Sequence, residues 1–350
     1  MSYRELSPRD QAALSVALQG AAIFGRDDLL AIRASGKHHR RFLHALLTAP
    51  FDPVEAGRSF AVTSTDAQGR LHAVADVLTD ADEVLLWTGR PQAQALVDRL
   101  LGHRVAERVQ IAIDESLAAV DLIGPAATEI ARAAGLPIPE QAGTWVAADV
   151  GEHAAKVTTL QPPSAHPEPD AGFPQVAGGL RISLPRDAVP ALVGPLLGAG
   201  AQVGCFAAGE AIRVLRGDPR LPVDVPEGST PWEAGLGDGV SLEKGCYLGQ
   251  EALAMQAWRG QLRRHLCWVV PEDGATPPPA GTLLRDEAGR RAGHTGSGVV
   301  LPEGALGLAM VSRKAAAPGT RLTAANADAD TGTTVALRVI GTTRQGVLAT

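Results

Sequence analysis

The eight residues 244–251 constrain the fold of this chain more than any other segment. Cys246 stands here between two glycines, with Lys244 before it and an amide and a carboxylate after it. Strong helix formers follow until Gly260, which predicts a tight loop leading into a helix. Unpaired N–H groups and the dipole at a helix start favour a thiolate, and so does a neighbouring lysine. The segment therefore predicts a reactive cysteine at the mouth of a helix.

The helix after this loop is expected to bury one stripe of side chains, because Leu248, Ala252 and Met255 fall at i, i+4 and i+7. Two interpretations of the loop stay open. Cys246 is either a reactive thiol or a small residue buried in a turn. Glu251 is either part of a binding pocket or a first-turn carboxylate that complements the helix dipole.

The cysteine count indicates a reducing compartment. There are three cysteines, with no C-x-x-C spacing, which argues against a disulfide framework and against a protein-borne zinc or iron–sulfur site. Cys205 and Cys267 lie in apolar segments and are expected in the core. The histidines show no ligand spacing, so no metal site is expected.

Length and charge set further bounds. A chain of 350 residues is expected to form two or three domains. A net charge of −6 gives no reason to expect binding to nucleic acid or to an anionic membrane. No apolar run approaches the roughly 20 residues that span a bilayer. The first residues lack a signal-peptide pattern, so the expected location is the cytoplasm.

Apolar periodicity predicts mixed helices and strands up to about residue 260, then short strands only. Ser7 is expected to cap a first helix, and strands 59–65 and 70–79 to form a hairpin. Residues 161–170 carry four prolines, which predicts an exposed, PPII-like loop. A small all-β module is expected over residues 265–347. Its predicted turns lie at Gly289, Gly293, Gly296 and Gly298.

Two basic segments can each be explained as an ordinary charged surface without a binding function. The run 37–41 lacks interleaved aromatic residues, which favours a solvated face over a nucleic-acid patch. Arg259, Arg263, Arg264 and His265 form a second cluster. It could face a polyglutamate tail or a partner, but a charged strand face fits equally well.

The loop also carries a family resemblance. Residues 244–251, K-G-C-Y-L-G-Q-E, resemble the motif K-G-C-[FY]-x-G-Q-E of the YgfZ-type folate-binding proteins, a branch of the glycine-cleavage T-protein (aminomethyltransferase) superfamily. Residues 230–236 are similar to the family's T-P-x-E-A-G-L segment and residues 42–48 to its F-L-H-x-L-L-T helix. Residues 66–70 resemble its D-x-x-G-R turn. The resemblance covers nearly the whole chain and is weakest between residues 135 and 180.

This resemblance implies an α+β fold, a three-part cloverleaf of the aminomethyltransferase type with a C-terminal β-barrel. Residues 1–160 and 179–262 would form the folate-binding α+β region as two interleaved subdomains. Residues 161–178 would be the Pro-rich loop and residues 265–347 the barrel.

It also implies a cofactor, partners and site residues. Tetrahydrofolate, or a one-carbon derivative of it, would lie where the three parts meet. The partners would be this folate and iron–sulfur client proteins, with no nucleic acid and no membrane. Cys246 would be the chemically active residue. The remaining motif residues are Lys244, Gly245, Tyr247, Gly249, Gln250 and Glu251, and the candidates for folate contacts are Asp66, Glu233 and Arg259.

Two departures from the T-proteins bear on function. Ala73 and Val74 stand where T-proteins carry paired aspartates, with Asp76 two residues further on. Arg181 stands where T-proteins hold the pterin with a glutamate. An arginine cannot accept hydrogen bonds from the pterin's donors as a carboxylate does. The first departure argues against glycine cleavage, and the second leaves the mode of folate binding open.

Three functions are therefore compared. The favoured one is a tetrahydrofolate-binding accessory protein for assembly or repair of iron–sulfur enzymes, acting through Cys246. The alternative is a folate-dependent one-carbon transferase or demethylase, in which Asp66 or Asp76 would polarise a substrate amine. The third is a folate sensor without chemistry of its own, so whether the protein is an enzyme stays open.

Overall fold

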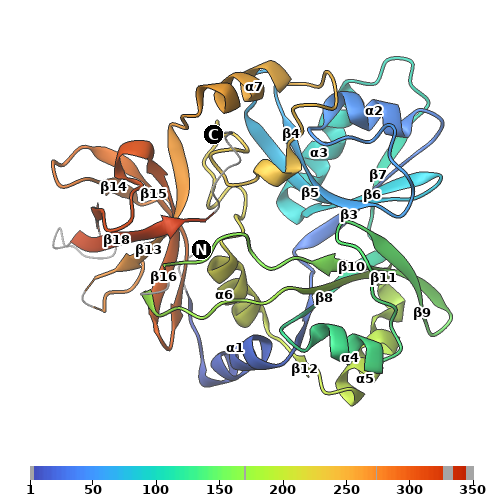
Figure 1. The fold of residues 1–350 in the computed structure, drawn as a ribbon, viewed down its shortest axis with the longest axis horizontal. Helices are drawn as coiled ribbons and strands as arrows, with labels where there is room; N and C mark the ends of the chain where they lie inside the picture. The colour runs from blue at the N-terminus through green and yellow to red at the C-terminus, as the bar shows by residue number, and fades with distance from the viewer. Residues whose placement is uncertain (1–3, 169–170, 273, 326–333, 344–350) are drawn as a thin grey trace.

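Three β-sheets organise this computed structural model, which describes residues 4–168, 171–272, 274–325 and 334–343. Figure 1 shows the three parts side by side: a C-terminal barrel at the left and two sheets with their helices at the right. The predicted α+β cloverleaf with a C-terminal β-barrel is confirmed.

The first part is an antiparallel sheet in the order β4-β5-β6-β3-β7. Helices α2 and α3 pack on one face, because Phe42, Leu43, Leu96 and Leu100 meet the inward side chains of the strands. The bounds are β3 Leu29–Ser35, α2 His39–Leu46, β4 Ser59–Thr65, β5 Leu71–Thr79, β6 Glu83–Gly89, α3 Arg90–Gly102 and β7 Gln110–Asp114.

The second part is a sheet in the order β12-β2-β8-β11-β10-β9. Helices α4 and α5 cover its outer face through a core that includes Ile130 and Leu196. Its inner face meets the first sheet through a cluster that includes Leu78, Trp87 and Ala119. The bounds are β2 Ala22–Gly25, β8 Leu117–Ile123, α4 Ala127–Ala133, β9 Trp145–Val150, β10 His153–Leu160, β11 Gly179–Pro185, α5 Val189–Gly198 and β12 Gln202–Val203.

The third part is the barrel, in the order β15-β14-β17-β18-β13-β16, closed by pairing of β16 with β15. Strand β1 adds to it in parallel along β15. Helices α1 and α6 pack against each other beside it, and Trp268 joins this apolar core. The bounds are β1 Arg4–Glu5, α1 Pro8–Gln19, α6 Phe206–Arg216, β13 Arg264–Pro271, β14 Leu283–Arg285, β15 Arg291–Leu301, β16 Gly304–Ser312, β17 Arg321–Ala325 and β18 Thr334–Thr342.

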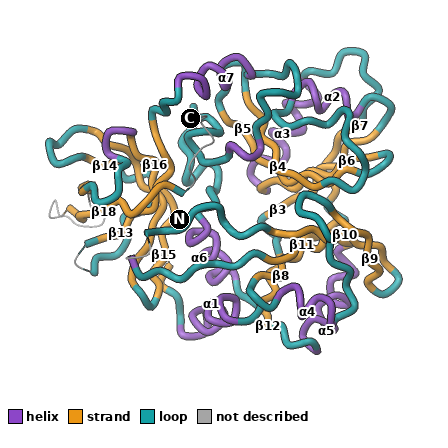
Figure 2. Tube along the Cα trace, viewed as in Figure 1, coloured by secondary structure: helices purple, strands orange, loops and turns teal. Residues whose placement is uncertain are grey.

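A long connection leads from α6 to the last helix, α7 (Gln250–Arg259). It contains no strand and only one short 3-10 helix, η3 (Gly237–Gly239), and is mostly loop in Figure 2. This connection carries two of the segments that resemble family motifs. They are therefore held by side-chain and loop contacts rather than by a sheet ladder.

Two sequence-based expectations are wrong. Gly293, Gly296 and Gly298 are not turns but lie within the eleven-residue strand β15. Gly296 is needed there because a Cβ would come within 2.4 Å of the Asp224 carboxylate. The Pro-rich segment 161–170 is also less exposed than expected, because Pro163 and Pro167 are buried.

A chain of buried charges joins the first two sheets. Arg181 on β11 binds Asp121 on β8 through two hydrogen bonds of 2.7 and 2.9 Å, and its third nitrogen lies 2.6 Å from Asp76 on β5. Arg26 lies 2.6 Å from the same Asp121 carboxylate and also pairs with Asp28. Burial alone would raise the pKa of Asp121, but Arg181 and Arg26 lower it to about 2. The carboxylate is therefore charged and shared by two arginines.

Within the described ranges, no helix combines the length and apolar character needed to cross a membrane.

Asp121→Asn is expected to lower the free energy of unfolding by about 3–5 kcal/mol, because it leaves two buried guanidinium groups short of a countercharge. Urea unfolding at neutral pH measures the change. Asp27→Asn is the matched control, since it breaks the exposed ion pair with Arg186 and should cost less than about 1 kcal/mol. Equal small losses in both variants would contradict this account of the sheet junction.

Candidate functional site

The motif 244–251 lies where the long connection meets α7, which runs above the gap between the barrel and the first sheet (Figure 1). Gly249, in the left-handed conformation at φ 89°, is the N-cap of α7. Cys246 therefore lies about one turn before the helix begins. The sequence predicted a position directly at the start of the helix, so the observed position differs from the expected one. The position of the cysteine depends on what fixes the loop.

Two glycines lock the loop against the first sheet. A Cβ on Gly249 would lie 2.3 Å from the carbonyl oxygen of Asp66 and 3.2 Å from the Cα of Gly69. A Cβ on Gly69 (φ 72°) would in turn meet the side chains of Ala252 and Leu253 at 3.2 Å. The D-x-x-G turn and the helix start can therefore approach this closely only without side chains. A hydrogen bond of 2.9 Å from Thr65 Oγ1 to the carbonyl of Leu248 joins them.

His44 on α2 holds the other end of the loop. Its Nδ1 accepts hydrogen bonds from the backbone N–H groups of Asp52 (3.0 Å) and Phe51 (3.3 Å), so the ring proton is on Nε2. Nε2 donates to the carbonyl oxygen of Lys244 at 2.9 Å, and Lys244 Nζ donates back to the carbonyl of His44. This reciprocal pair fixes the residue two places before Cys246.

Lys244 has a structural role in this arrangement. Its ammonium group lies 4.7 Å from the centre of the Tyr247 ring and donates to the His44 carbonyl. Burial lowers the pKa of Lys244 to about 8. The ammonium group therefore helps to hold the loop through Tyr247 and His44, and it is also close to Cys246 in the sequence.

Tyr247 anchors the loop in a small core with Trp232, Leu253 and Ala257. Trp232 Nε1 also donates to the carbonyl of Leu253 at 3.2 Å, so the T-P-x-E-A-G-L segment braces the helix. The Tyr247 hydroxyl is buried without a hydrogen-bond partner among the described residues. The predicted buried stripe is wrong, because Met255 is half exposed and Leu253 and Ala257 point inward instead.

Cys246 is exposed, unlike the other two cysteines. Cys267 is fully buried, as expected, and burial raises the pKa of its thiol to about 12. Cys205 is only partly buried: it caps α6 and its Sγ donates to Asp10 at 2.9 Å. Burial and this hydrogen bond raise the pKa of Cys205. The interpretation of Cys246 as a small residue buried in a turn is excluded.

The other motif residues lie around the loop. Gln250 Nε2 donates to the carbonyl of Leu242 at 3.3 Å, and Glu251 is exposed in the first turn of α7. Gly245 has φ 98°, with open space where a Cβ would lie. Its left-handed backbone allows the chain to turn just before the cysteine.

The three residues predicted to contact folate do not share side-chain partners, so their contacts do not bring them together at one point. Burial opposes ionisation of Asp66, but hydrogen bonds from the N–H groups of Arg70 and Gln68 lower its pKa and tie it to its own turn. Glu233 is buried and pairs with Arg264 at 2.9 Å. Arg259 is exposed at the end of α7.

Sequence reasoning missed His44 and Thr65 as residues that hold the loop. His44 stands in the F-L-H-x-L-L-T segment, and its place in that motif was the available signal. Thr65 gave no signal, because its partner Leu248 is 183 residues away.

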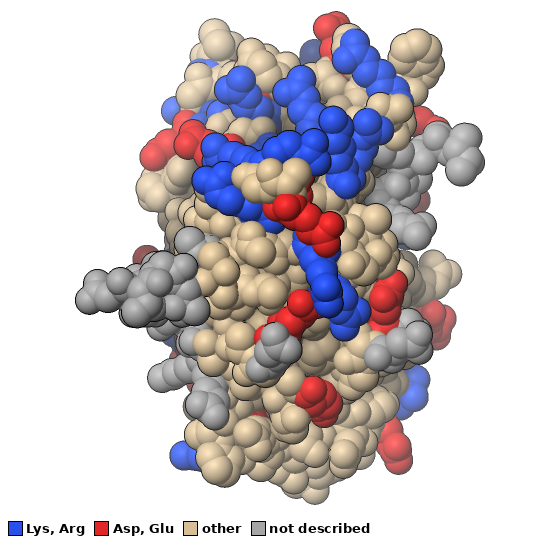
Figure 3. Space-filling model, turned by 90° about the vertical axis from the view of Figure 1, so that its left-hand side faces the viewer, with Lys and Arg blue, Asp and Glu red and all other residues tan. Residues whose placement is uncertain are grey.

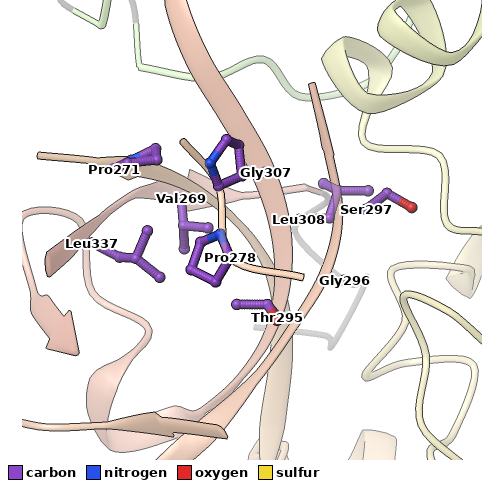
Figure 4. Close-up of a pocket in the computed structure, with 10 residues that line it drawn as sticks. Val269, Pro271, Pro278, Thr295, Gly296, Ser297, Gly307, Leu308 and Leu337 are labelled. Carbon is purple, nitrogen blue, oxygen red and sulfur yellow. The ribbon is translucent and has the colours of Figure 1, made fainter. Parts of the chain in front are cut away.

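A small cavity in the barrel is not a cofactor site. It is lined by residues that include Val269, Thr295 and Leu337, as Figure 4 shows. Its volume of about 10 Å³ has room for one water molecule at most. Among the described residues, no group of three or more His, Cys, Asp or Glu side chains could hold a metal ion.

Comparison with a solved structure defines the class of fold. The aminomethyltransferase T of the glycine cleavage system from Bartonella henselae superposes with a TM-score of 0.77 at 22% identity, over 94% of this chain and 87% of the other. The fold is therefore that of the glycine-cleavage aminomethyltransferases. No protein-family model matches the chain.

The sequence relatives confirm the resemblance to the YgfZ-type branch of this superfamily. The tRNA-modifying protein YgfZ of Edwardsiella ictaluri is 26% identical over 251 residues, 69% of each chain. A protein of Arabidopsis thaliana named as a chloroplastic transferase is 24% identical over 324 residues, 90% of this chain and 70% of the relative. Human iron–sulfur cluster assembly factor IBA57 is 34% identical over 126 residues, 34% of this chain. The chain spans only about a third of the length of IBA57 and of the bacterial aminomethyltransferases it matches.

Gly249→Ala is expected to lower the free energy of unfolding by about 2–4 kcal/mol, from left-handed strain and from the clash with the Asp66 carbonyl. Gly245→Ala is the matched control. It has a similar φ but open space, so only the strain of about 1–2 kcal/mol remains. Urea unfolding of the two variants compares them. A loss for Gly249→Ala no larger than for Gly245→Ala would contradict the interlock.

Lys244 is expected to make stability rise with pH. Its folded-state pKa of about 8 lies below the ordinary value of 10.5, so the folded protein binds fewer protons between these pH values. The charged form is disfavoured at all pH values below 8, and this penalty is relieved as pH rises towards 10.5. The total change in the free energy of unfolding should be about 1 kcal/mol, because the side chain is only half-buried and solvent screens its charge.

Urea unfolding of the protein and of Lys244→Met at several pH values measures this effect. The difference in free energy of unfolding, protein minus variant, should increase from pH 8 to pH 10. A difference that is flat or that falls over this range would show that burial does not dominate at Lys244.

Proposed function

We propose that this protein is an accessory factor for the assembly or repair of iron–sulfur enzymes and that Cys246 is its acting group. The observation that carries this proposal is an exposed thiol on a loop fixed at both ends, by His44 on one side and by the Gly69–Gly249 contact on the other. Accessible thiols bind iron as thiolates and attack electrophilic centres. The relative IBA57 is named as an iron–sulfur cluster assembly factor, which supports the direction of the proposal.

Within this role, Cys246 would serve as a transient ligand or nucleophile while a client protein is docked. The fixed loop keeps the thiol in one place, so little conformational entropy is lost when the client arrives. The neighbouring Gly245 has open space where a side chain would lie, so the loop leaves room for a partner at this position.

We further propose tetrahydrofolate, or a one-carbon derivative, as the ligand of the region where the three parts meet. Arg181 does not fit the T-protein mode, because all its contacts go to Asp121 and Asp76 and it has no acceptor. Asp76 does fit as a replacement: its side chain is 52% exposed and only Oδ2 is bound by Arg181. Asp76 would accept hydrogen bonds from the pterin, and the hydrogen bond from Arg181 would keep its carboxylate oriented. Folate itself supplies a carrier for one-carbon units.

The proposed division of labour follows the three parts. Residues 1–160 and 179–262 would form the folate-binding region, residues 161–178 a linking loop and residues 265–347 the barrel. Glu251, Glu233, Asp66 and Arg259 remain candidates for contacts with folate or with a client. The proposed compartment is the cytoplasm.

A one-carbon transferase acting on an amine is less well supported. Such an enzyme needs a free carboxylate near the substrate amine. Ala73 lies in the apolar core of the first sheet, and Asp66 is held by its own turn. Asp76 is the acceptor already assigned to the pterin. Production of methylene-tetrahydrofolate from an aminomethyl donor would restore this alternative.

The test is Cys246→Ala in cells that lack the native gene, with two iron–sulfur enzymes and one unrelated enzyme assayed. Both iron–sulfur activities should fall at least about tenfold at equal protein level, as expected when an acting thiol is lost. Cys205→Ser is the control, because serine also caps a helix and the variant leaves Cys246 intact. Unchanged iron–sulfur activities in Cys246→Ala would overturn the proposal.

Calorimetry with tetrahydrofolate on the protein and on Asp76→Asn tests the folate contact separately, and binding should weaken in the variant.

A further inference from the structure

A basic cleft opens on the barrel, next to the end of α7. We call it the barrel groove. It has a volume of about 910 Å³ and is formed by the loop after α7, the β14–β15 hairpin, the end of β16 and the start of β17. Its charged lining residues are Arg263, Arg290, Arg291, Arg313, Lys314, Arg321, Asp286 and Glu287. Figure 3 shows Lys and Arg side chains gathered on the upper part of the face on this side of the molecule.

Cations outnumber anions in the barrel groove by six to two. One of the acids, Asp286, is already neutralised by Arg290 at 2.8 Å. Arg321 pairs with Glu272, which is outside the groove. The excess charge is therefore carried by the remaining cations.

Four of these cations have no salt bridge to an acidic side chain among the described residues: Arg263, Arg291, Arg313 and Lys314. Of these, Arg291 lies 2.8 Å from the His294 ring. The backbone holds two of them together, because the N–H of Arg313 donates to the carbonyl of Arg263 at 2.9 Å. Like charges held side by side across paired segments destabilise a fold. An arrangement of this kind fits a site that receives an anionic partner.

Two exposed apolar side chains lie on α7, the helix between the Cys246 loop and this groove. Met255 and Trp258 lie three residues apart on α7, so they share one face of the helix, and their exposed fractions are 51% and 87%. Gln261, three residues after Trp258, lines the barrel groove. Trp and Arg are the residue types that most often dominate protein–protein binding energy.

The distances suit a single interface. Helix α7 has ten residues and is about 15 Å long. A standard protein interface covers about 800 Å² on each partner, a patch of roughly 30 Å across. One docked protein could therefore contact the Cys246 loop, the face of α7 and the barrel groove together.

We propose that the barrel groove and the exposed face of α7 dock the client protein, through an acidic segment that the client carries beside the site to be served by Cys246. This inference rests on the proposed function. Carboxylates of the segment bind Arg263, Arg313 and Lys314, while an apolar side chain of the client covers Met255 and Trp258. Arginine binds carboxylates through paired hydrogen bonds, which gives such a segment a defined orientation.

RNA is the competing partner, since a basic groove beside an exposed aromatic side chain also binds single strands. Two observations favour a protein. One of the two exposed side chains is the aliphatic Met255, which offers no stacking surface, and the helix that carries it begins four residues after Cys246.

The first test uses a fluorescein-labelled octaglutamate peptide, with anisotropy measured at low ionic strength. Binding to the full protein should weaken at least about tenfold in the double variant Arg263→Glu/Arg313→Glu. Lys37→Glu/Arg41→Glu reverses two exposed cations of the other basic run and should leave binding unchanged. No binding of the peptide, or equal weakening in both variants, would overturn the proposal. The proposal would also be overturned if an oligouridylate of equal charge bound more tightly than the peptide and if Trp258→Ala abolished that binding.

The second test separates docking from chemistry in cells. Arg263→Glu/Arg313→Glu and Trp258→Ala should each lower iron–sulfur enzyme activity, although the Cys246 thiol still reacts with a maleimide at the normal rate. If Cys246→Ala lowers these activities and the groove variants do not, the docking surface is wrong and the proposed function stands. If Cys246→Ala has no effect, the proposed function fails, and the peptide titration alone decides whether the groove binds acidic segments.

Discussion

The close contact between Gly69 and Gly249 is the constraint on which the rest of the site depends. It brings the turn of one hairpin to the start of a helix 180 residues later in the chain, at a separation that no side chain would permit. Once this contact is made, Leu248 meets Thr65, Tyr247 enters its core and the loop can close onto His44. Cys246 is then the residue that remains outside. Its exposure is a consequence of how tightly the residues around it are held.

Buried ion pairs join the first two sheets of the fold that this chain shares with the aminomethyltransferases. The strand position expected to hold a pterin carries Arg181, which is bound on both sides by aspartates. A charge buried this deeply costs several kcal/mol unless it is paired, so the arginine and its partners are expected to change together. The central region of this chain is therefore organised around an arginine, and Asp76 is the most exposed of the acidic side chains in these ion pairs.

The sequence predicted the class of fold through its family resemblance, and it predicted the loop through local signals. The glycines, the helix formers and the family motif all lie within a few residues of one another. It failed where distant contacts decide the outcome. Position 296 requires a glycine because Asp224 approaches it, although the residue lies within a strand. Met255 is exposed because Leu253 faces the Trp232 core, and Glu233 is engaged by Arg264. The barrel groove was hidden for a similar reason. A net charge of −6 averages over the chain, whereas the groove gathers cations from four separate segments.

The central claim is that the fold holds one thiol, that of Cys246, in the open while it shields the others. Native-state alkylation with quantification of each cysteine by mass spectrometry tests this most directly. Cys246 should be modified first, Cys205 more slowly because it is hydrogen-bonded to Asp10, and Cys267 only after unfolding. Modification of Cys246 no faster than that of Cys267 would contradict the account.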